Sequence, residues 1–463
     1  MREKAKTKNI AYLTSSSYNY GGGWIRDALL VKNIRASGEK IYFYSTFFKP
    51  FTGEKVNIDS LFFKIGDVLL AHNIPNYSEL PVLPKIEYPN IKYNLNRIPF
   101  LKDISLKNDF ITINLENITA KFIKNIENKI ISNISAEIKE KKEQEILDSI
   151  LLGSGGKLKR EVKKMENKFK KNRIELVNTC SVLWSGIISD MNMDLTHIAT
   201  LQGYDMIIGA YPQDYRENVI DKLKENAKQT DSFIAISKYY AKKAGRELNI
   251  PLNKIDVVYN GVDTTLYKPK NVKKKSDVFS ITYLGRITPV KGALNLVFAA
   301  KHLKEENYKK FQIIISGNID RNDIDYLNVL KKYIALFGME KIIEFKFNIS
   351  QREKIALLNR TDVVVYPTIY PEPFGLVPIE SMACGTPVIL PDHGAFTEII
   401  EETKGGLLCK PNDSVDLSEK IISLIEDKDL LKRLSETGLK NIKEKFNASV
   451  FAKNILEVYK KMS

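Results

Sequence analysis

Two glutamates, Glu372 and Glu380, flank a loop whose composition suits the binding of a phosphate and a polyhydroxyl group side by side. The apolar run before this loop predicts a buried strand, and a helix that carries the second glutamate is expected after it. A loop between a strand end and a helix start presents free backbone N–H groups to an anion, here those of Phe374, Gly375 and Leu376. Because a carboxylate repels phosphate, the two glutamates should face hydroxyl groups. A phosphate joined to a polyhydroxyl group is the chemistry of a sugar nucleotide.

The elements that must position this loop alternate between strands and helices along the second half of the chain. The predicted strands cover residues 280–284, 311–316, 342–345, 363–366 and 388–390. The predicted helices cover residues 292–303, 324–337, 352–360, 417–425, 428–446 and 450–462. Such alternation implies a mostly parallel sheet that is covered by helices on both faces.

The start of the chain predicts a second sheet of the same kind. A strand at residues 9–14 leads into a loop that ends in Gly21-Gly22-Gly23, followed by a helix at residues 24–37 and a strand at residues 41–45. This order is typical of the first unit of a doubly wound half. The loop lacks the Gly-x-Gly-x-x-Gly spacing, so a dinucleotide fingerprint is not supported. An ordinary glycine-rich turn with no ligand is the alternative interpretation.

The complete segment around the two glutamates resembles a known family signature. It reads Glu-Pro-Phe-Gly-Leu-Val-Pro-Ile-Glu-Ser-Met-Ala-Cys-Gly-Thr-Pro-Val and is similar to the signature of glycosyltransferase family 4, or glycosyl transferases group 1, which are retaining enzymes of the GT-B fold. The resemblance covers residues 174–460 well, residues 9–45 in outline and residues 73–170 hardly at all. It implies an α/β protein with two Rossmann-like doubly wound domains facing an interdomain cleft. The implied reaction moves a sugar from a UDP-, GDP- or ADP-linked donor to an acceptor.

The same resemblance assigns roles to individual residues. Arg286 and Lys291 match the basic pair that holds the diphosphate, and such cations can stabilise the charge that grows on it when the glycosidic bond breaks. Glu372 would hold hydroxyls of the transferred sugar beside the reacting carbon, which makes these three the expected catalytic set. Glu380 would accept hydrogen bonds from the ribose. The other expected donor contacts are Gly22 and Gly23 near the diphosphate and Asn318 near the base. No metal or other cofactor is expected, since no Asp-x-Asp signature takes part.

The acceptor side departs from the family pattern at one position. Gln202 stands where family members commonly carry a histidine near the reacting sugar. A glutamine can hydrogen-bond a sugar hydroxyl but cannot titrate, so the ordinary acceptor chemistry is in question. His197, five residues earlier, is expected to be structural. The alternative function is therefore a non-catalytic subunit that binds a nucleotide sugar within a glycosyltransferase complex.

Three parts are expected along the chain. The turn Asn260-Gly261-Val262-Asp263 matches the family motif at the end of the first domain, and the lysine-rich residues after it predict a linker. We expect an acceptor-side domain at residues 1–265, with a long insertion at about 73–170. A donor-binding domain is expected at 266–445, and a terminal helix at 446–463 that crosses back onto the first domain.

A net charge of +15 indicates either an acidic partner or general enrichment in lysine. The predicted helix at residues 157–173 carries a net charge of +7, with an apolar stripe formed by Leu158, Val162, Met165 and Phe169. Such a helix can lie on an anionic membrane, or it can pack its stripe on its own domain. A lipid-linked or envelope glycan is thus the favoured acceptor, and a soluble acceptor is the second. Nucleic acid is not expected, because the basic residues lack interleaved aromatics in a recognisable module.

The cysteines and the hydropathy pattern indicate the compartment. The three cysteines are scattered, with neither metal-ligand spacing nor a disulfide framework. No signal-type segment and no run of 18 apolar residues occurs in the sequence. We therefore expect a cytoplasmic protein, with peripheral attachment at the inner membrane face as one version.

Overall fold

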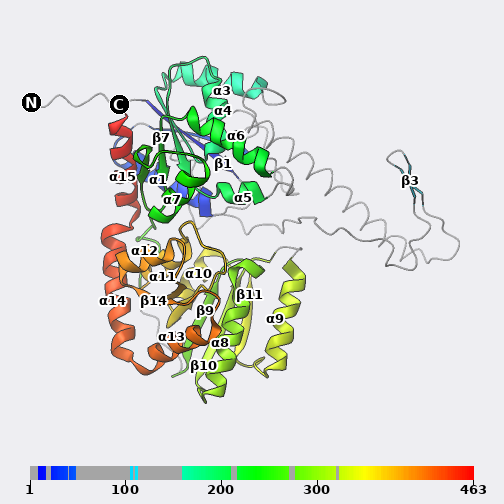
Figure 1. Ribbon diagram of the computed structural model, residues 1–463. Helices are drawn as coiled ribbons and strands as arrows, with labels where there is room; N and C mark the ends of the chain where they lie inside the picture. The colour runs from blue at the N-terminus through cyan, green and yellow to red at the C-terminus, as the bar shows by residue number, and fades with distance from the viewer. Residues whose placement is uncertain are drawn as a thin grey trace, which may run out of the picture.

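Two parallel sheets, one in each half of the chain, form two lobes (Figure 1). The structure is a computed structural model that describes residues 9–16, 22–39, 41–47, 105–107, 110–112, 159–209, 216–270, 277–319 and 323–462. Most of the insertion expected at about 73–170 lies outside the described residues.

The first sheet has the order β2-β1-β5-β6-β7-β8, and each neighbouring pair is parallel. Its strands are β1 (Ile10–Ser16), β2 (Ile41–Phe47), β5 (Leu176–Thr179), β6 (Thr196–Leu201), β7 (Ser232–Ala235) and β8 (Ile255–Val257). The helices around it are α1 (Gly22–Ala36), α3 (Lys159–Lys171), α4 (Ser185–Ser189), α5 (Tyr204–Gly209), α6 (Arg216–Lys228) and α7 (Lys238–Glu247). A separate antiparallel pair joins β3 (Ser105–Lys107) to β4 (Phe110–Thr112).

The second sheet has the order β11-β10-β9-β12-β13-β14 and is also parallel throughout. Its strands are β9 (Phe279–Leu284), β10 (Phe311–Gly317), β11 (Ile343–Phe347), β12 (Val363–Val365), β13 (Val388–Pro391) and β14 (Gly406–Cys409). Its helices are α8 (Ala293–Glu305), α9 (Ile324–Leu336), α10 (Gln351–Leu358), α11 (Leu376–Ala383), α12 (Phe396–Thr403), α13 (Ser414–Glu426) and α14 (Lys428–Lys445). The central strand β12 is the fully buried Val-Val-Val run, as parallel sheets covered on both faces require.

The predicted α/β class, with two doubly wound sheets, is confirmed. Two elements of the second lobe, α12 and β14, were not predicted from the sequence. Helix α12 has only eight residues and begins without a side-chain cap, so it lacks the usual start signal. Strand β14 has only four residues, of which the first is a glycine.

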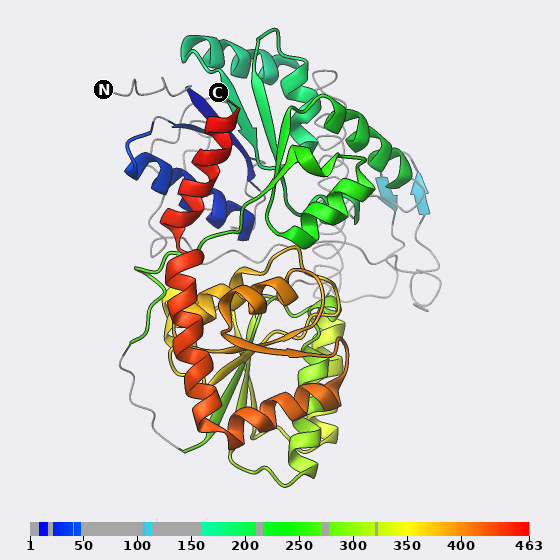
Figure 2. The same cartoon turned by 60° about the vertical axis from the view of Figure 1, so that its left-hand side comes forward.

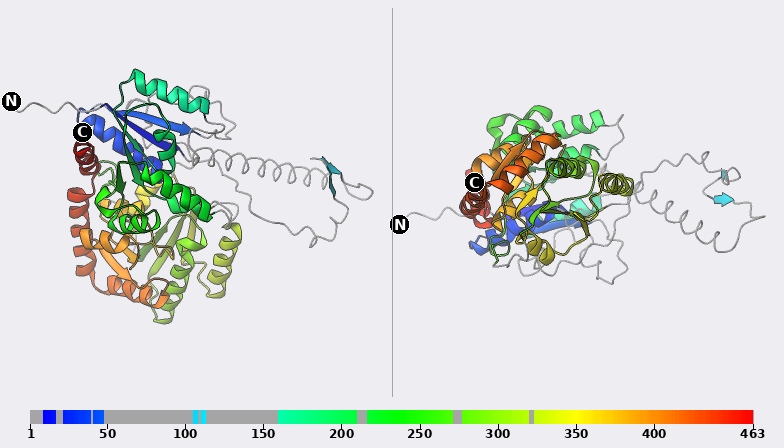
Figure 3. Two further views of the ribbon diagram at one scale, coloured as in Figure 1. Left: turned by 45° about the horizontal axis from the view of Figure 1, so that its top comes forward. Right: turned by 90° about the horizontal axis from the view of Figure 1, so that it is seen from below.

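The last helix, α15 (Ala448–Lys461), lies against the first lobe beside α1, whereas α14 before it lies along the second lobe (Figures 2 and 3). The junction is fixed by the turn that ends the first lobe. The Val262 N–H donates to the Phe446 carbonyl at 2.8 Å, and the Ala448 N–H donates to the Val262 carbonyl at 3.0 Å. Farther along α15, the Tyr459 hydroxyl donates to Asn178 Oδ1 at 2.7 Å. Helix α15 is therefore part of the first lobe's core.

The described part of the apolar stripe on α3 is buried within the first lobe, and Leu158 lies outside the described residues. Val162, Met165 and Phe169 are 6%, 1% and 0% exposed and belong to its hydrophobic core. Among the basic residues on the outer face, Lys163 and Lys170 pair with Glu166 of the same helix. Of the two interpretations of this helix, the structure supports packing on its own domain.

Candidate functional site

The loops that carry the predicted donor-side residues meet at the carboxyl edge of the second sheet. Strands β10, β9 and β12 are neighbours, and the loop after each one carries at least one of these residues. The Ile287 N–H donates to the Asn318 carbonyl at 2.9 Å, which joins the first two loops. The Ile369 N–H donates to the Val290 carbonyl at 2.9 Å, which joins the loop after β9 to the loop after β12. Ligands of open parallel sheets bind at this edge.

Lys291 and Glu372, which are 81 residues apart in sequence, form an ion pair at this edge. Both side chains are nearly buried, at 12% and 10% exposure. The lysine Nζ also lies 5.6 Å from the ring centroid of Tyr366 and 5.9 Å from that of Tyr370, within cation–π range. The ammonium and the carboxylate are therefore neighbours at this edge. A ligand that carries a phosphate next to hydroxyl groups can contact both of them.

Arg286 completes the basic pair on the loop after β9. Its side chain is exposed, and no described residue forms a hydrogen bond or ion pair with the guanidinium. The Tyr283 hydroxyl donates to its carbonyl at 2.6 Å, which fixes the backbone. Burial raises the pKa of Tyr283, so this phenol remains a neutral donor. The guanidinium can thus donate two parallel hydrogen bonds to an anion such as a phosphate.

The loop between β12 and α11, which carries Glu372, leads from a strand into a helix as the sequence predicted. Gly375 has φ of 95°, where an added Cβ would lie 2.7 Å from Phe396, so a glycine is required. The ring of Phe374 is buried between Tyr259 and Phe446. The backbone N–H groups of Phe374, Gly375 and Leu376 donate no hydrogen bond to any described residue. They are available to an anion at the start of α11.

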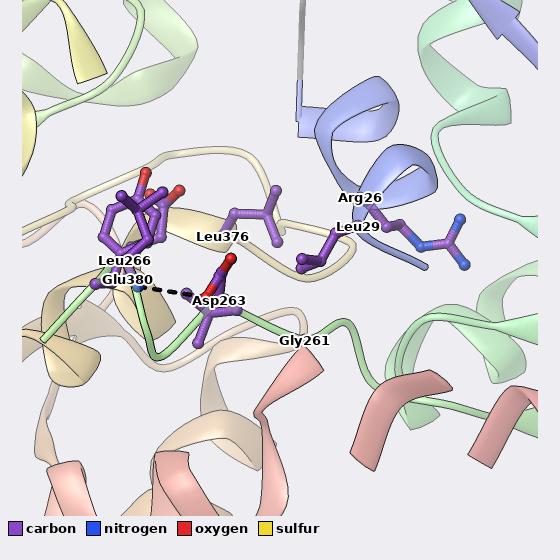
Figure 4. A pocket seen from close by; sticks show the side chains of 9 residues that line it. Arg26, Leu29, Gly261, Asp263, Leu266, Leu376 and Glu380 are labelled. Atoms are coloured by element: carbon purple, nitrogen blue, oxygen red, sulfur yellow. Dashed lines mark hydrogen bonds between the residues drawn. The ribbon is translucent and has the colours of Figure 1, made fainter. Parts of the chain in front are cut away.

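Glu380 faces a different cation from Glu372. It is 5% exposed and pairs with Lys354 of α10, whose Nζ lies 5.6 Å from the ring centroid of Tyr267. Figure 4 shows Glu380 and Leu376 beside a small cavity between the lobes. The cavity measures about 20 Å³, which is room for one water. The sequence did not point to Lys354.

Arg26 of α1 lines the same cavity, but its guanidinium points away from the cavity into a buried polar cluster (Figure 4). Arg26 donates to Asp27 at 2.8 Å, to the Tyr12 hydroxyl at 3.2 Å and to Asn260 Oδ1 at 2.5 Å. Its guanidinium carbon lies 5.3 Å from the ring centroid of Phe451 in α15. The cluster therefore ties α1 to the turn between the lobes and to the returning helix. Nothing in the sequence pattern indicated it.

The first lobe supplies fewer of the predicted residues. Gly22 and Gly23 are the first two residues of α1, and the loop before them lies outside the described residues. Gln202 follows β6 directly and is half-buried, and no described residue hydrogen-bonds its side chain. His197 lies inside β6 at 3% exposure, with Nε2 3.0 Å from Thr179 Oγ1. Burial lowers the pKa of His197 to about 3, so it stays neutral and structural.

Two acidic residues that the chemistry argument did not use connect the lobes beside Glu372. Glu398 of α12 is 8% exposed and accepts hydrogen bonds from the backbone N–H groups of Lys238 and Tyr239, both at 2.9 Å, and from the Tyr259 hydroxyl at 2.8 Å. It therefore caps the first turn of α7 from the opposite lobe. Asp205 accepts a hydrogen bond of 2.7 Å from the Tyr370 hydroxyl.

Metal ligation and membrane spanning find no support in the part of the chain that the structure describes. Among those residues, no group of three or more His, Cys, Asp or Glu side chains could hold a metal ion. None of the helices that the structure describes is both long enough and apolar enough to cross a bilayer.

Family comparisons match most of the chain in two adjoining pieces. Residues 265–441 match the model of the glycosyl transferases group 1, and residues 147–266 match that of glycosyltransferase family 4. An uncharacterised glycosyltransferase of Methanocaldococcus jannaschii, MJ1178, is 27% identical over 82% of this chain and 99% of its own length.

Other relatives align over little more than half of their own length. A second uncharacterised M. jannaschii glycosyltransferase, MJ1607, is 27% identical over 49% of this chain and 59% of itself. The MMP alpha-(1->4)-mannosyltransferase of Mycolicibacterium hassiacum is 26% identical over 52% of this chain and 57% of itself.

Among solved structures, Anabaena Alr3699/HepE in complex with UDP has a TM-score of 0.66 at 17% identity, covering 98% of this chain and 100% of its own. Sucrose-phosphate synthase of Thermosynechococcus elongatus has a TM-score of 0.63 at 17% identity, covering 98% and 99%. These likenesses show the fold.

Proposed function

We propose that this chain, which belongs to the group 1 and family 4 glycosyltransferases of the GT-B fold, transfers a sugar from a nucleotide donor to an acceptor held between its lobes. The observation that carries the proposal is the contact between Lys291 and Glu372. In a sugar nucleotide the phosphate is bonded directly to the reacting sugar carbon. Groups that hold the phosphate and the sugar hydroxyls must therefore be neighbours, as this cation and this carboxylate are.

The donor is bound from three sides in this proposal. Arg286 and Lys291 hold the diphosphate, and the backbone N–H groups at the start of α11 add to them. Glu380 holds the ribose, with Lys354 beside it as a further polar neighbour. Asn318 lies on the base side, and Gly22 and Gly23 approach the diphosphate from the first lobe. Uridine nucleotides are the first choice for a test, because HepE is described in complex with UDP and with UDP-glucose.

The reaction class follows from the same arrangement. Negative charge grows on the leaving diphosphate when the glycosidic bond breaks, and preorganised cations at that place lower the barrier. Retention of the anomeric configuration is the family's stereochemistry and is proposed here on that ground. Gln202 is proposed to hydrogen-bond the acceptor or the sugar without taking a proton.

The acceptor is proposed to be a lipid-linked or envelope glycan. The support is the basic side of α3, which is exposed. The apolar stripe of this helix is buried in its own domain, so only the basic side can face a membrane. Attachment to a membrane would then be electrostatic and would weaken with added salt. Sedimentation with vesicles that contain anionic lipid tests the membrane attachment separately. If the protein does not sediment with these vesicles, the proposal of a membrane-bound acceptor loses its support.

The test of the function compares wild type with Glu372→Gln in binding UDP and in turning over UDP-glucose, GDP-mannose and ADP-glucose. The substitution frees Lys291 from its ion pair, so UDP should bind at least as tightly as before. Turnover should fall by about 100-fold, as expected when a group that holds the reacting sugar is lost. A wild type that binds UDP but releases no sugar from any donor, with candidate glycan acceptors present, would instead indicate the non-catalytic binding subunit that Gln202 suggests.

A further inference from the structure

We propose that Asp205 is a positioning residue that holds the Glu372 loop through a hydrogen bond to Tyr370, and so couples the seating of the two lobes to the Lys291–Glu372 pair. The inference deepens the proposed function and rests on it for the catalytic consequence. Its structural part stands on contacts of the described residues alone.

The bond joins the two lobes at the edge of the candidate site. Tyr370 lies in the loop after β12, two residues before Glu372, and its hydroxyl donates to Asp205 Oδ2 at 2.7 Å. Asp205 is in the first turn of α5, three residues after Gln202. The bond therefore runs from the donor-side loop to the segment that carries the predicted acceptor-side residue.

Asp205 is itself held firmly by the first lobe. The Tyr240 hydroxyl donates to its Oδ1 at 2.8 Å, and the Lys243 Nζ lies 3.8 Å from its Oδ2. The Tyr240 hydroxyl in turn accepts from the Tyr204 N–H at 3.1 Å, which joins α5 to α7. The carboxylate is 16% exposed. A partly buried, charge-assisted acceptor of this kind defines a position more sharply than an exposed pair does.

Tyr370 connects this anchor to the charged pair in the other lobe. The centroid of its ring lies 5.9 Å from Lys291 Nζ, while its hydroxyl donates to Asp205. Burial raises the pKa of Tyr370, and Asp205 raises it further, so the phenol stays a neutral donor. Next along the loop, Ser237 Oγ of the first lobe donates to the Pro373 carbonyl at 2.6 Å. Glu372 is thus bracketed by two contacts that both come from the first lobe.

The coupling follows from this geometry. If the first lobe moves away from the second, the Tyr370–Asp205 bond must break, and the loop that carries Glu372 loses one of its supports. Arg286, one of the groups proposed to hold the diphosphate, lies on a different loop, the one after β9. The bond should therefore matter for sugar transfer, which needs Glu372 in place, more than for nucleotide binding.

The test compares Tyr370→Phe with Tyr204→Phe as a matched control. Both substitutions remove one phenol hydroxyl that donates to a carboxylate at 2.7 Å, but the bond from Tyr204 to Glu247 stays within the first lobe. Amide hydrogen exchange is followed at Ile369, whose N–H is bonded to the Val290 carbonyl, and at the neighbouring residues of the loop. Exchange there should rise by about tenfold in Tyr370→Phe and stay unchanged in the control.

Binding and turnover provide the second readout. The Kd for UDP should stay within about threefold of wild type in Tyr370→Phe, while kcat for UDP-glucose falls by about tenfold with KM nearly unchanged. Asp205→Asn keeps an oxygen that can accept the phenol's hydrogen bond, so it should retain part of the loop protection that Asp205→Ala loses. The double variant with Tyr370→Phe and Asp205→Ala should show no more exchange than Asp205→Ala alone, because both changes remove the same bond.

The outcomes separate the two proposals. Unchanged exchange in Tyr370→Phe, or an equal rise in Tyr204→Phe, overturns the positioning role whatever the activity. A wild type that neither binds nor turns over a sugar nucleotide overturns the proposed function, while the exchange measurement still decides on the bond. An equal loss in kcat and in UDP affinity would also contradict the inference, since it would indicate general damage to the site.

Discussion

The contact between Glu398 and α7 predicts that a substitution in the second lobe will destabilise the first. In Glu398→Gln, the single side-chain oxygen cannot face both the Lys238 and Tyr239 N–H groups, which now bond to different carboxylate oxygens. One of these partly buried N–H groups then meets an NH₂ group, which costs about 1–3 kcal/mol. Loss of the negative charge at the start of α7 adds about 0.3–1 kcal/mol. We therefore expect a loss of about 1–4 kcal/mol in the free energy of unfolding.

The assay uses the placement of the tryptophans. The sequence has two, Trp24 and Trp184, and both belong to the first lobe. Their fluorescence therefore reports on the lobe that does not carry the substitution. For a urea dependence of about 2–3 kcal/mol per molar, the expected loss lowers the fluorescence-detected midpoint by about 1 M.

The matched control is Glu419→Gln on the exposed side of α13, where no described residue pairs with the carboxylate. Its midpoint should stay at the wild-type value, because surface substitutions usually change stability by less than about 0.5 kcal/mol. If Glu398→Gln and Glu419→Gln gave the same fluorescence-detected midpoint, Glu398 would not act as a cap between the lobes.

Two further predictions concern buried titratable groups. Because the pKa of His197 is lowered to about 3 in the folded chain, acidification below the ordinary value of 6.5 protonates this residue only on unfolding. Between pH 7 and pH 5, the free energy of unfolding of wild type should thus fall by about 2 kcal/mol relative to that of His197→Gln. Urea unfolding at both pH values measures this difference. A difference that does not change with pH would mean that the histidine is not held neutral. Burial raises the pKa of Cys384 and of Cys409 to about 12, and Cys180 is 3% exposed. Ellman's reagent at pH 8 should therefore label no thiol in the folded protein and all three in guanidinium chloride, and fast labelling without denaturant would contradict the buried placement.

Much of the fold could be predicted from the sequence because local signals agreed with one another. The Val-Val-Val run, the glycine after it and the helix with its early proline all indicate strand, loop and helix in that order. The same agreement was absent from α12, which has no side-chain cap and only two turns. The helix forms because one of its faces packs against the rest of the lobe. Eight residues are too few for the spacing of apolar residues to reveal that face.

The sequence pointed to residues that the structure brings together at one edge of the second sheet, but it did not indicate how they pair. Glu372 and Lys291 were each expected to face a different half of the donor, and their contact with each other depends on two neighbouring strands that are far apart in sequence. Asp205 carried no signal at all, since its role depends on where Tyr370 of the other lobe lies. The stripe on α3 fitted both a membrane and a protein core, and only the packed structure distinguishes these.

The central claim is that the carboxyl edge of the second sheet binds a nucleotide diphosphate. Calorimetric titration of UDP, GDP and ADP into wild type and Arg286→Ala, without added metal, tests it most directly. The account predicts that one nucleotide binds wild type and loses at least about tenfold in affinity in the variant, since a guanidinium–phosphate contact is removed. A nucleotide that binds both proteins equally, or no binding at all by wild type, would contradict the claim.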